Sequence, residues 1–362
     1  MGIETPLLSE HEKLGAEIGV FAGWRTAMVF SSALKEALDT RTKATVFDVS
    51  HMARILVKGE DAEELLEYLI PRFIAKAPAG RMIGPSALLN ENAGFKDDVM
   101  VYKIDGSHFL IVGNAVNRKK DLEWILHVLG EKGLNVHVED LTEETAMLAL
   151  QGPQTPEVLE KLVGVKGNEM GMLEFKSGLN TTLGRIWILS KSGWTGEPGF
   201  EIISSIEVIK KIWKALIEKG VEPAGLGARD ILRIEMGFCL YGHEINEHTT
   251  PLEARYKVFS NKKRGYIGYD ALHERYRRGV ERLRYGLLLN KGSPIPREGT
   301  TVYAAEVRVG EVTSGTFSPF LKRPIAEFYV QPSHAYLGFH LEVEIRGKKY
   351  TAKIVDFPFV KK

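Results

Sequence analysis

Cysteine is almost absent from this sequence, with Cys239 as its single representative. One thiol cannot form an intramolecular disulfide, and it cannot build a cysteine-based zinc or iron–sulfur site within one chain. No apolar run approaches the roughly 18 residues that a membrane-spanning helix needs. The amino-terminal segment has neither an apolar signal core nor an arginine-rich transit helix. We therefore expect a cytoplasmic protein that has no membrane partner.

An excess of charge of either sign is also missing. The chain has 362 residues, of which 48 are Lys or Arg and 47 are Asp or Glu. A nucleic-acid-binding protein usually needs a basic surplus, so we expect no nucleic-acid partner. Hydrophobic residues make up 44% of the chain, which is ordinary for a globular protein, and the length is sufficient for two or three domains.

Helix and strand signals are mixed, without the steady alternation of a parallel α/β sheet, and this predicts an α+β fold. The clearest helix is expected at 207–219, where apolar side chains recur at helical spacing and Gly220 ends the run. Another helix is expected to begin at Thr155, with Thr155 as its cap and Pro156 at its first position. The remaining predicted helices are 61–70, 120–129 and 229–236.

The character of the chain changes near residue 284. The segment 275–284 is rich in arginine and is expected to be a polar connector. After it come short strand-like runs with turn residues between them, which predict an all-β carboxy-terminal module. These runs are 284–289, 301–309, 340–346 and 350–355.

The most informative pattern is an Asp-Gly pair at 105–106 between two strand-like runs. This pair favours a two-residue hairpin turn. In the register of such a turn, Asp98 faces Gly113 and Asp97 faces Asn114. Two carboxylates and an amide would then gather at the open end of one hairpin, beside a glycine that leaves room for a ligand. A solvated turn before an ordinary strand is the alternative.

Three other segments have polar residues in suggestive patterns. The segment 48–51 has the residue types of a hydrolase triad, but successive residues of a strand point to opposite faces. Asp48 and Ser50 would therefore face away from His51, which disfavours a triad. The histidines of 243–248 are five positions apart, so one helix face cannot present both to zinc. The segment 194–201 offers an aromatic ring and two glutamates that could hold a flat heterocycle, or it forms a plain β-turn.

Taken together, these segments resemble the glycine cleavage system T-protein family, the aminomethyltransferases, over essentially the whole chain. The resemblance consists of many short motifs in the order in which the family has them. They are 5–7, 21–24, 47–52, 97–98, 113–114, 150–153, 194–197, 200–202, 228–230, 240–242, 268–272 and 310–319.

The resemblance implies a three-domain cloverleaf around a central folate channel. Residues 1–50 and 141–274 would form a discontinuous folate-binding domain. Residues 51–140 would form an inserted ferredoxin-like α+β domain that carries the Asp98 hairpin, and residues 275–362 a carboxy-terminal β-barrel.

The resemblance also implies a reaction. Family members transfer the methylene group of an aminomethyl-dihydrolipoyl H-protein to tetrahydrofolate, which releases ammonia and gives 5,10-methylenetetrahydrofolate. The expected partner is therefore the lipoylated H-protein, and the expected co-substrate is tetrahydrofolate or a modified tetrahydropterin, without a metal.

The resemblance assigns roles to particular residues. Asp98 matches the catalytic aspartate, whose carboxylate can stabilise positive charge at the reacting carbon and take up a proton. Glu201 matches a position at which a carboxylate can accept two hydrogen bonds from a pterin ring. The other expected folate-contacting residues are Met52, Tyr102, Asn114, Trp194 and Arg229.

Some positions depart from the family pattern. Pro85 replaces an aromatic residue, Trp194 replaces a common tyrosine, and Lys191 stands where arginine is frequent. Two related functions are the alternatives: a folate-dependent demethylase of a small molecule, and a non-enzymatic folate-binding protein for iron–sulfur maturation. The second is marked by a cysteine that the segment 263–268 lacks.

Two basic clusters could dock an acidic lipoyl carrier. One consists of Lys262, Lys263 and Arg264, and the other of Arg275, Arg277 and Arg278. A solvated loop and helix would explain the same residues without a partner.

Overall fold

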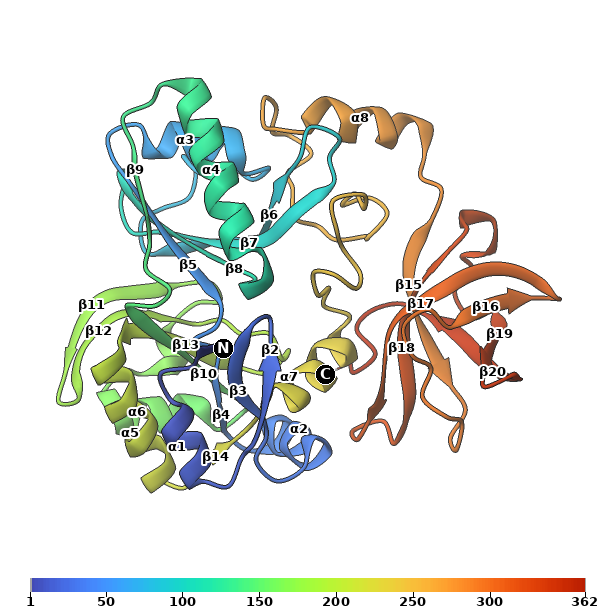
Figure 1. The fold of residues 1–362 in the computed structure, drawn as a ribbon, viewed down its shortest axis with the longest axis horizontal. Coiled ribbons are helices and arrows are strands. Elements are labelled where there is room, and N and C mark those ends of the chain that lie inside the picture. Colours follow the sequence, from blue (N-terminus) through green and yellow to red (C-terminus); the bar gives the residue numbers. More distant parts are fainter. Residues whose placement is uncertain (1, 362) are drawn as a thin grey trace. The chain divides into compact units, whose positions relative to one another are not determined.

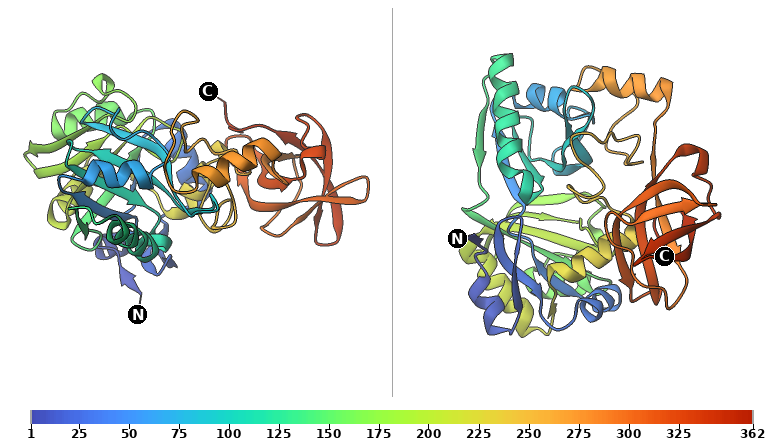
Figure 2. Two further views of the ribbon diagram at one scale, coloured as in Figure 1. Left: turned by 90° about the horizontal axis from the view of Figure 1, so that it is seen from above. Right: turned by 45° about the vertical axis from the view of Figure 1, so that its right-hand side comes forward.

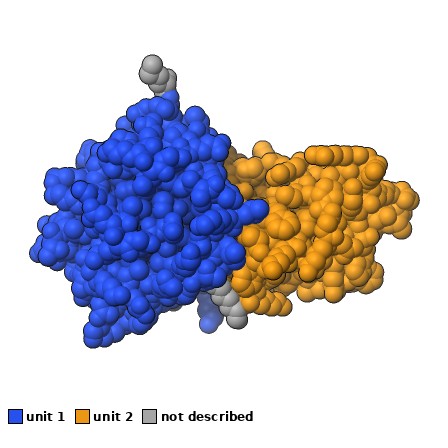
Figure 3. All heavy atoms as spheres, turned by 90° about the horizontal axis from the view of Figure 1, so that it is seen from below, with its two compact units in different colours: residues 1–88, 96–229, 258–267 blue, residues 89–95, 230–257, 268–362 orange. Residues whose placement is uncertain are grey.

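The computed structural model describes residues 2–361, which separate into two compact units (Figure 3). Unit 1 contains the residues up to 88 together with 96–229 and 258–267. Unit 2 contains 89–95, 230–257 and the residues from 268 onward. Both units combine strands with helices or loops, and the α+β class is confirmed. The division into three domains stays a prediction.

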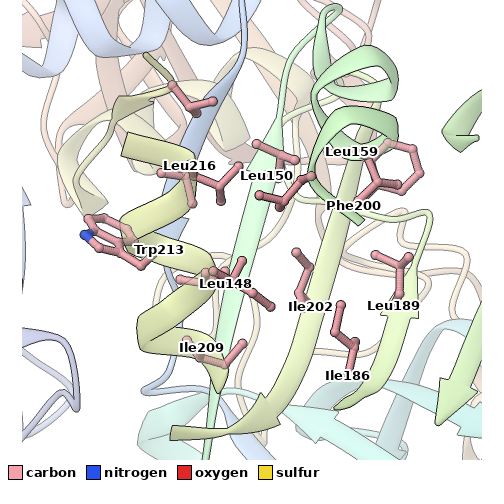
Figure 4. Close-up of a cluster of buried hydrophobic side chains, with 14 of the residues drawn as sticks. Leu148, Leu150, Leu159, Ile186, Leu189, Phe200, Ile202, Ile209, Trp213 and Leu216 are labelled. Carbon is pink, nitrogen blue, oxygen red and sulfur yellow. The ribbon is translucent and has the colours of Figure 1, made fainter. Parts of the chain in front are cut away.

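A six-stranded sheet forms one half of unit 1, with strand order β11-β12-β13-β10-β4-β14. Helices α5 and α6 pack on it through a cluster of fully buried apolar side chains (Figure 4). Trp213 and Leu216 of α6 lie in this cluster with Leu148 and Ile202 of the sheet. The elements are β4 (Thr45–Asp48), β10 (Thr145–Gln151), α5 (Thr155–Val163), β11 (Phe175–Thr181), β12 (Gly184–Ser190), β13 (Gly199–Ser205), α6 (Ile206–Glu218) and β14 (Glu222–Pro223).

A five-stranded sheet forms the other half of unit 1, with strand order β6-β7-β8-β5-β9. Helices α3 and α4 cover the same face of this sheet (Figures 1 and 2). Strands β9, β5, β8 and β7 have the order of a ferredoxin-like unit, to which β6 is added at the edge. The elements are β5 (Ala53–Lys58), α3 (Ala62–Leu69), β6 (Arg81–Leu89), β7 (Phe95–Lys103), β8 (His108–Gly113), α4 (Arg118–Lys132) and β9 (His137–Asp140).

Smaller elements complete unit 1. A three-stranded sheet has the order β1-β3-β2. Helix α7 begins in unit 1 and continues into unit 2. These elements are β1 (Ile3–Glu4), α1 (Leu8–Lys13), β2 (Glu17–Phe21), β3 (Trp24–Val29), α2 (Ala33–Thr42), η1 (Ala115–Asn117), η2 (Gly167–Glu169) and α7 (Leu226–Met236).

Unit 2 contains a closed barrel with strand order β15-β18-β17-β16-β19-β20, which confirms the predicted carboxy-terminal β-barrel. Alternating apolar side chains of its strands, such as Leu287, Val302 and Phe328, fill the barrel interior. The elements are α8 (Tyr269–Arg278), β15 (Leu283–Leu289), β16 (Thr301–Ala304), β17 (Val307–Ser318), β18 (Arg323–Val330), η3 (Pro332–His334), β19 (His340–Ile345) and β20 (Lys348–Val355).

Buried charges in unit 2 connect the end of α7 to the barrel. Arg233 donates to Glu244 over 2.8 Å and to the Ser314 hydroxyl over 2.8 Å. Arg284 forms an ion pair with Glu327, and both side chains are almost completely buried. Because an uncompensated buried charge is strongly destabilising, these pairs fix the position of α7 on the strands.

Most predicted elements are confirmed, but some boundaries were wrong. The cap of α5 is Gln154, so Thr155 already belongs to the helix. The expected connector at 275–284 begins as the last turn of α8. The single strand predicted at 301–309 is two strands, because the chain turns at Ala305 and Glu306 with positive φ angles. Within residues 2–361, no helix has the length and apolar character needed to cross a bilayer.

Candidate active site

Strand β7 has two chemically different faces. Val99 and Val101 lie in the apolar core under α3 and α4. Because side chains alternate along a strand, Asp97 shares this helix-covered face. Asp98 and Tyr102 project from the opposite face, which the two helices do not cover. The two adjacent aspartates therefore have separate environments although they are neighbours in sequence.

The hairpin register differs from the prediction by one residue. Met100 pairs with Val112, whereas the two-residue turn would have placed Met100 opposite Ile111. The predicted turn was therefore wrong, and residues 104–107 form a longer loop. Asp105 explains the difference, since its carboxylate accepts a hydrogen bond from the Ser107 backbone N–H over 2.8 Å. Such an Asx turn favours this loop over the tighter one.

The predicted convergence of Asp97, Asp98 and Asn114 is nevertheless present. Asn114 follows β8, and its side-chain Nδ2 donates to Asp97 Oδ1 and to Asp98 Oδ1, each over 2.7 Å. Its backbone N–H donates to Asp97 Oδ2 over 2.8 Å. Asp98 is 9% exposed, and Asp97 is fully buried. The Asn114 amide therefore connects Asp98, on the uncovered face of the sheet, with Asp97, on the helix-covered face.

Gly113 serves a different purpose from the one predicted. A Cβ atom at this position would lie 2.7 Å from Asp97 Oδ2 and 3.2 Å from Asp121 Oδ2. The glycine therefore makes room for two carboxylates and not for a ligand. Asp121, in the first turn of α4, was not predicted, because an acidic residue at a helix start is usually explained by the helix dipole.

The carboxyl groups of Asp97 and Asp121 are both buried and lie next to each other beside Gly113. Burial raises the pKa of Asp97, although hydrogen bonds from Asn114 and Asn117 oppose the shift. Burial and the neighbouring Asp97 raise the pKa of Asp121 to about 11. Both shifts favour the protonated form of the pair.

A second network of polar side chains surrounds Glu201. The Tyr102 hydroxyl lies 3.3 Å from Ser190 Oγ, and Ser190 Oγ lies 2.8 Å from Ser192 Oγ. Ser192 in turn donates to Glu201 Oε2 over 2.5 Å. Burial raises the pKa of Glu201, and the charge of Arg229 opposes this effect. Neither serine was predicted, although their alternate positions at the end of β12 place them on one face.

Arg229 and His51 have polar atoms without a partner among the described residues. Arg229 Nη1 and His51 Nδ1 are both buried and make no hydrogen bond there. Arg229 Nη2 lies 3.9 Å from the Met52 sulfur, which brings two predicted folate-contacting residues together. Burial lowers the pKa of His51 to about 4, so this imidazole is neutral at physiological pH. Buried polar atoms without partners indicate a place for a polar ligand.

Trp194 lies half-buried in the loop between β12 and β13. Gln151 supports this loop, since its Nε2 donates to the Ser192 carbonyl over 3.1 Å and its Oε1 accepts from Thr195 over 2.8 Å. Glu197 forms a buried ion pair with Arg41 at 2.9 Å. Of the two glutamates predicted to offer a carboxylate here, Glu197 is therefore committed to the fold.

Lys191 is also explained by the fold. Its ammonium group donates to the carbonyl oxygens of Met170 over 2.7 Å and Gly167 over 3.2 Å. It therefore holds the segment around η2. Pro85, on β6, is half-buried, and its carbonyl accepts a hydrogen bond from Arg72 over 2.6 Å.

In the first basic cluster, Lys262 and Arg264 are exposed but Lys263 is buried. Lys263 is only 3% exposed, so its side chain is not available at the surface for docking. Its ammonium group donates to the carbonyl oxygens of Ile70 and Arg72 and forms an ion pair with Glu67. Lys262 and Arg264 remain exposed, as do the three arginines of α8.

The sequence matches the models of two protein-family domains. Residues 7–264 match the GCVT N-terminal domain, and residues 282–361 match the glycine cleavage T-protein C-terminal barrel domain. The chain is 42% identical to a probable aminomethyltransferase of Aeropyrum pernix, over 97% of this chain and 96% of that protein. It is 40% identical to an aminomethyltransferase of Rubrobacter xylanophilus, over 99% and 94%.

A solved structure has the same fold. The crystal structure of glycine cleavage system aminomethyltransferase T from Bartonella henselae matches with a TM-score of 0.91 and 36% identity, over 99% of this chain and 98% of that chain. Each match extends over nearly the full length of both chains, and it includes the strands and loops that carry the candidate site. The chain belongs to the glycine cleavage T-protein family, the aminomethyltransferases.

Proposed function

We propose that this chain transfers the methylene carbon of an aminomethyl-dihydrolipoyl H-protein to tetrahydrofolate, with Asp98 as the catalytic carboxylate. The observation that carries the proposal is the fixed position of Asp98. Asn114 holds this carboxylate from one side, over 2.7 Å, on the face of β7 that α3 and α4 leave uncovered. Tyr102, four residues later on the same face, is connected to Glu201 by hydrogen bonds through Ser190 and Ser192.

The chemistry explains why a carboxylate is useful there. The carbon loses its bonds to ammonia and to the lipoyl sulfur, and it gains two bonds to folate nitrogens without oxidation or reduction. Positive charge develops on the carbon as ammonia leaves. Asp98 can stabilise this charge and accept a proton from the attacking nitrogen. Its low exposure strengthens the electrostatic effect, because little water screens the carboxylate.

The pterin ring would be held by Glu201 and its neighbours. A pterin presents an amino group and a ring N–H side by side, and a carboxylate can accept both. Ser192 uses one oxygen of Glu201 as its acceptor, which orients the carboxylate. Arg229 contributes an unpartnered buried N–H, and Met52 and Trp194 offer apolar and aromatic contact area.

The docking face for the H-protein would lie on α8. Arg275, Arg277 and Arg278 are all exposed on this helix, and Tyr276 is 73% exposed beside them. An acidic carrier could be attracted to such a basic face and be oriented by it. The proposal rests on charge, and a solvated helix is the simpler explanation that a charge-reversal experiment must exclude.

Purified protein can test the proposed reaction directly. It would be mixed with aminomethyl-loaded H-protein and tetrahydrofolate, and both ammonia and methylenetetrahydrofolate would be followed. We expect the two products in equal amounts, and no product if either substrate is omitted. If the protein forms no product from loaded H-protein but demethylates a free methylated amine, it is a demethylase and the proposal is wrong.

A further inference from the structure

The carboxylate cluster contains two buried acidic groups, Asp97 and Asp121, that the proposed reaction does not use. Asp97 and Asp121 are 0% and 1% exposed, and their carboxyl groups meet beside Gly113, where an added Cβ would lie 2.7 Å from Asp97 Oδ2 and 3.2 Å from Asp121 Oδ2. A carboxylate can only accept hydrogen bonds, so a carboxyl–carboxyl bond requires a proton on one member. Two adjacent buried carboxylates would in addition repel each other strongly.

The surrounding donors decide which member carries the proton. Asp97 accepts from the Asn114 backbone N–H, from Asn114 Nδ2 and from Asn117 Nδ2, over 2.6–2.8 Å. These donors favour the charged form of Asp97. Asp121 has no comparable support, and its Oδ1 has no partner among the described residues. Its electrostatic neighbours include the carboxylates of Asp97 and Asp98 and the cation Lys120.

We propose that Asp121 is a positioning residue that keeps its proton at neutral pH and donates it in a hydrogen bond to Asp97. Asp97 then holds Asn114, and Asn114 holds Asp98 on the opposite face of the sheet. The first turn of α4 would in this way control the orientation of the catalytic carboxylate. This inference rests on the proposed role of Asp98.

The chain offers variants that separate a positioning role from a general structural one. Asp121→Asn keeps an N–H donor toward Asp97 and cannot ionise. Asp121→Leu has a similar size and removes the donor. Glu123→Gln, on the same helix, makes the same carboxyl-to-amide replacement at an exposed position, where Glu123 pairs with Lys119. It serves as the matched control.

The proton can be observed without any reaction. In ligand-free protein labelled with carbon-13 at the aspartate carboxyl carbons, we expect one acid-form resonance at pH 7. It should be absent from Asp121→Asn and present in Glu123→Gln. If no aspartate is in the acid form at pH 7, or if the resonance persists in Asp121→Asn, the inference is wrong. This result stands whether or not the protein is a transferase.

Kinetics test the positioning role. We expect Asp121→Asn to keep nearly all of the wild-type kcat, because it preserves the hydrogen bond. Asp121→Leu should lower kcat by about tenfold to a hundredfold while the KM for tetrahydrofolate changes little, since a misplaced catalytic group slows chemistry more than binding. Equal losses in both variants would overturn the role. If Asp121→Leu does not fold, the comparison of Asp121→Asn with wild type still decides.

Discussion

The two carboxylates of the candidate site, Asp98 and Glu201, are both largely buried, but their partners differ. Asn114 orients Asp98, whereas Ser192 orients Glu201. We propose that the first carboxylate meets a developing positive charge. The second lies near Arg229, whose Nη1 has no hydrogen-bond partner among residues 2–361. We therefore separate their roles into chemistry and binding.

Replacement of Glu201 tests its role in binding. We expect Glu201→Ala to weaken tetrahydrofolate binding by about 2–5 kcal/mol, because it removes a buried charged hydrogen-bond acceptor. Calorimetric titration measures this difference. Glu207→Ala is the control, since Glu207 is exposed and pairs with Lys211 on its own helix. Unchanged affinity in Glu201→Ala would show that the pterin is held elsewhere.

The pH dependence of binding provides a second test of Glu201. Its pKa is raised by burial, and only the ionised carboxylate accepts both pterin hydrogen bonds. Affinity should therefore be greatest above this raised pKa and fall as the pH is lowered through it. Titrations across the acidic range should show this decline in the wild type. An affinity that rises toward acid would contradict the assignment.

Sequence reasoning identified part of the site. Asp97, Asp98 and Asn114 could be predicted because a hairpin brings nearby segments together. Asp121 and Ser192 were not predicted, since their contacts with Asp97 and Glu201 depend on how neighbouring elements pack and have no turn signal in the sequence. The family resemblance indicated Glu201 and Arg229, and the structure adds the serines that connect Glu201 to Tyr102.

Elements are predictable where local signals suffice. Helix α6 could be placed from its apolar periodicity and from Gly220, which has a φ of 80°. The hairpin loop could not, because an Asp-Gly pair is compatible with several turns and the Asp105 side chain selects among them. The order of strands in the two large sheets depends on long-range pairing, for which the sequence has no local signal.

Packing of α6 on its sheet gives a prediction at this scale. Leu216 is fully buried among the side chains shown in Figure 4. Leu216→Ala should lower the free energy of unfolding by about 2–5 kcal/mol, because it leaves a cavity in a close-packed core. Urea unfolding measures the loss. Lys214→Ala, on the exposed side of the same helix, should change it by no more than about 0.5 kcal/mol. Similar values for both would show that this core is loosely packed.

At the scale of the whole molecule, composition predicted a globular α+β protein with an all-β end. It could not predict which surface charges are accessible. Lys262, Lys263 and Arg264 look equivalent in sequence, but Lys263 is buried because Glu67 and two carbonyl groups of unit 1 surround its ammonium group. A docking test should therefore use α8, where all three arginines are exposed.

Charge reversal of Arg275, Arg277 and Arg278 to Glu should slow transfer from H-protein and flatten its dependence on salt, because the attraction to an acidic carrier is lost. Reaction with a small soluble aminomethyl-dihydrolipoamide should be unaffected. Reversal of the exposed Lys210, Lys211 and Lys214 on α6 makes the same net change elsewhere and is the control. Equal losses with both substrates would mean that α8 serves the fold.

The most direct test of the account is the turnover of Asp98→Asn with aminomethyl-loaded H-protein and tetrahydrofolate. This change keeps the shape of the side chain and removes its charge. Asp105→Asn, in the exposed loop of the same hairpin, is the matched control. We predict that Asp98→Asn lowers kcat by on the order of a hundredfold or more, with folate affinity little changed, and that the control is active. Turnover of Asp98→Asn close to the wild-type value would contradict the central role of this carboxylate.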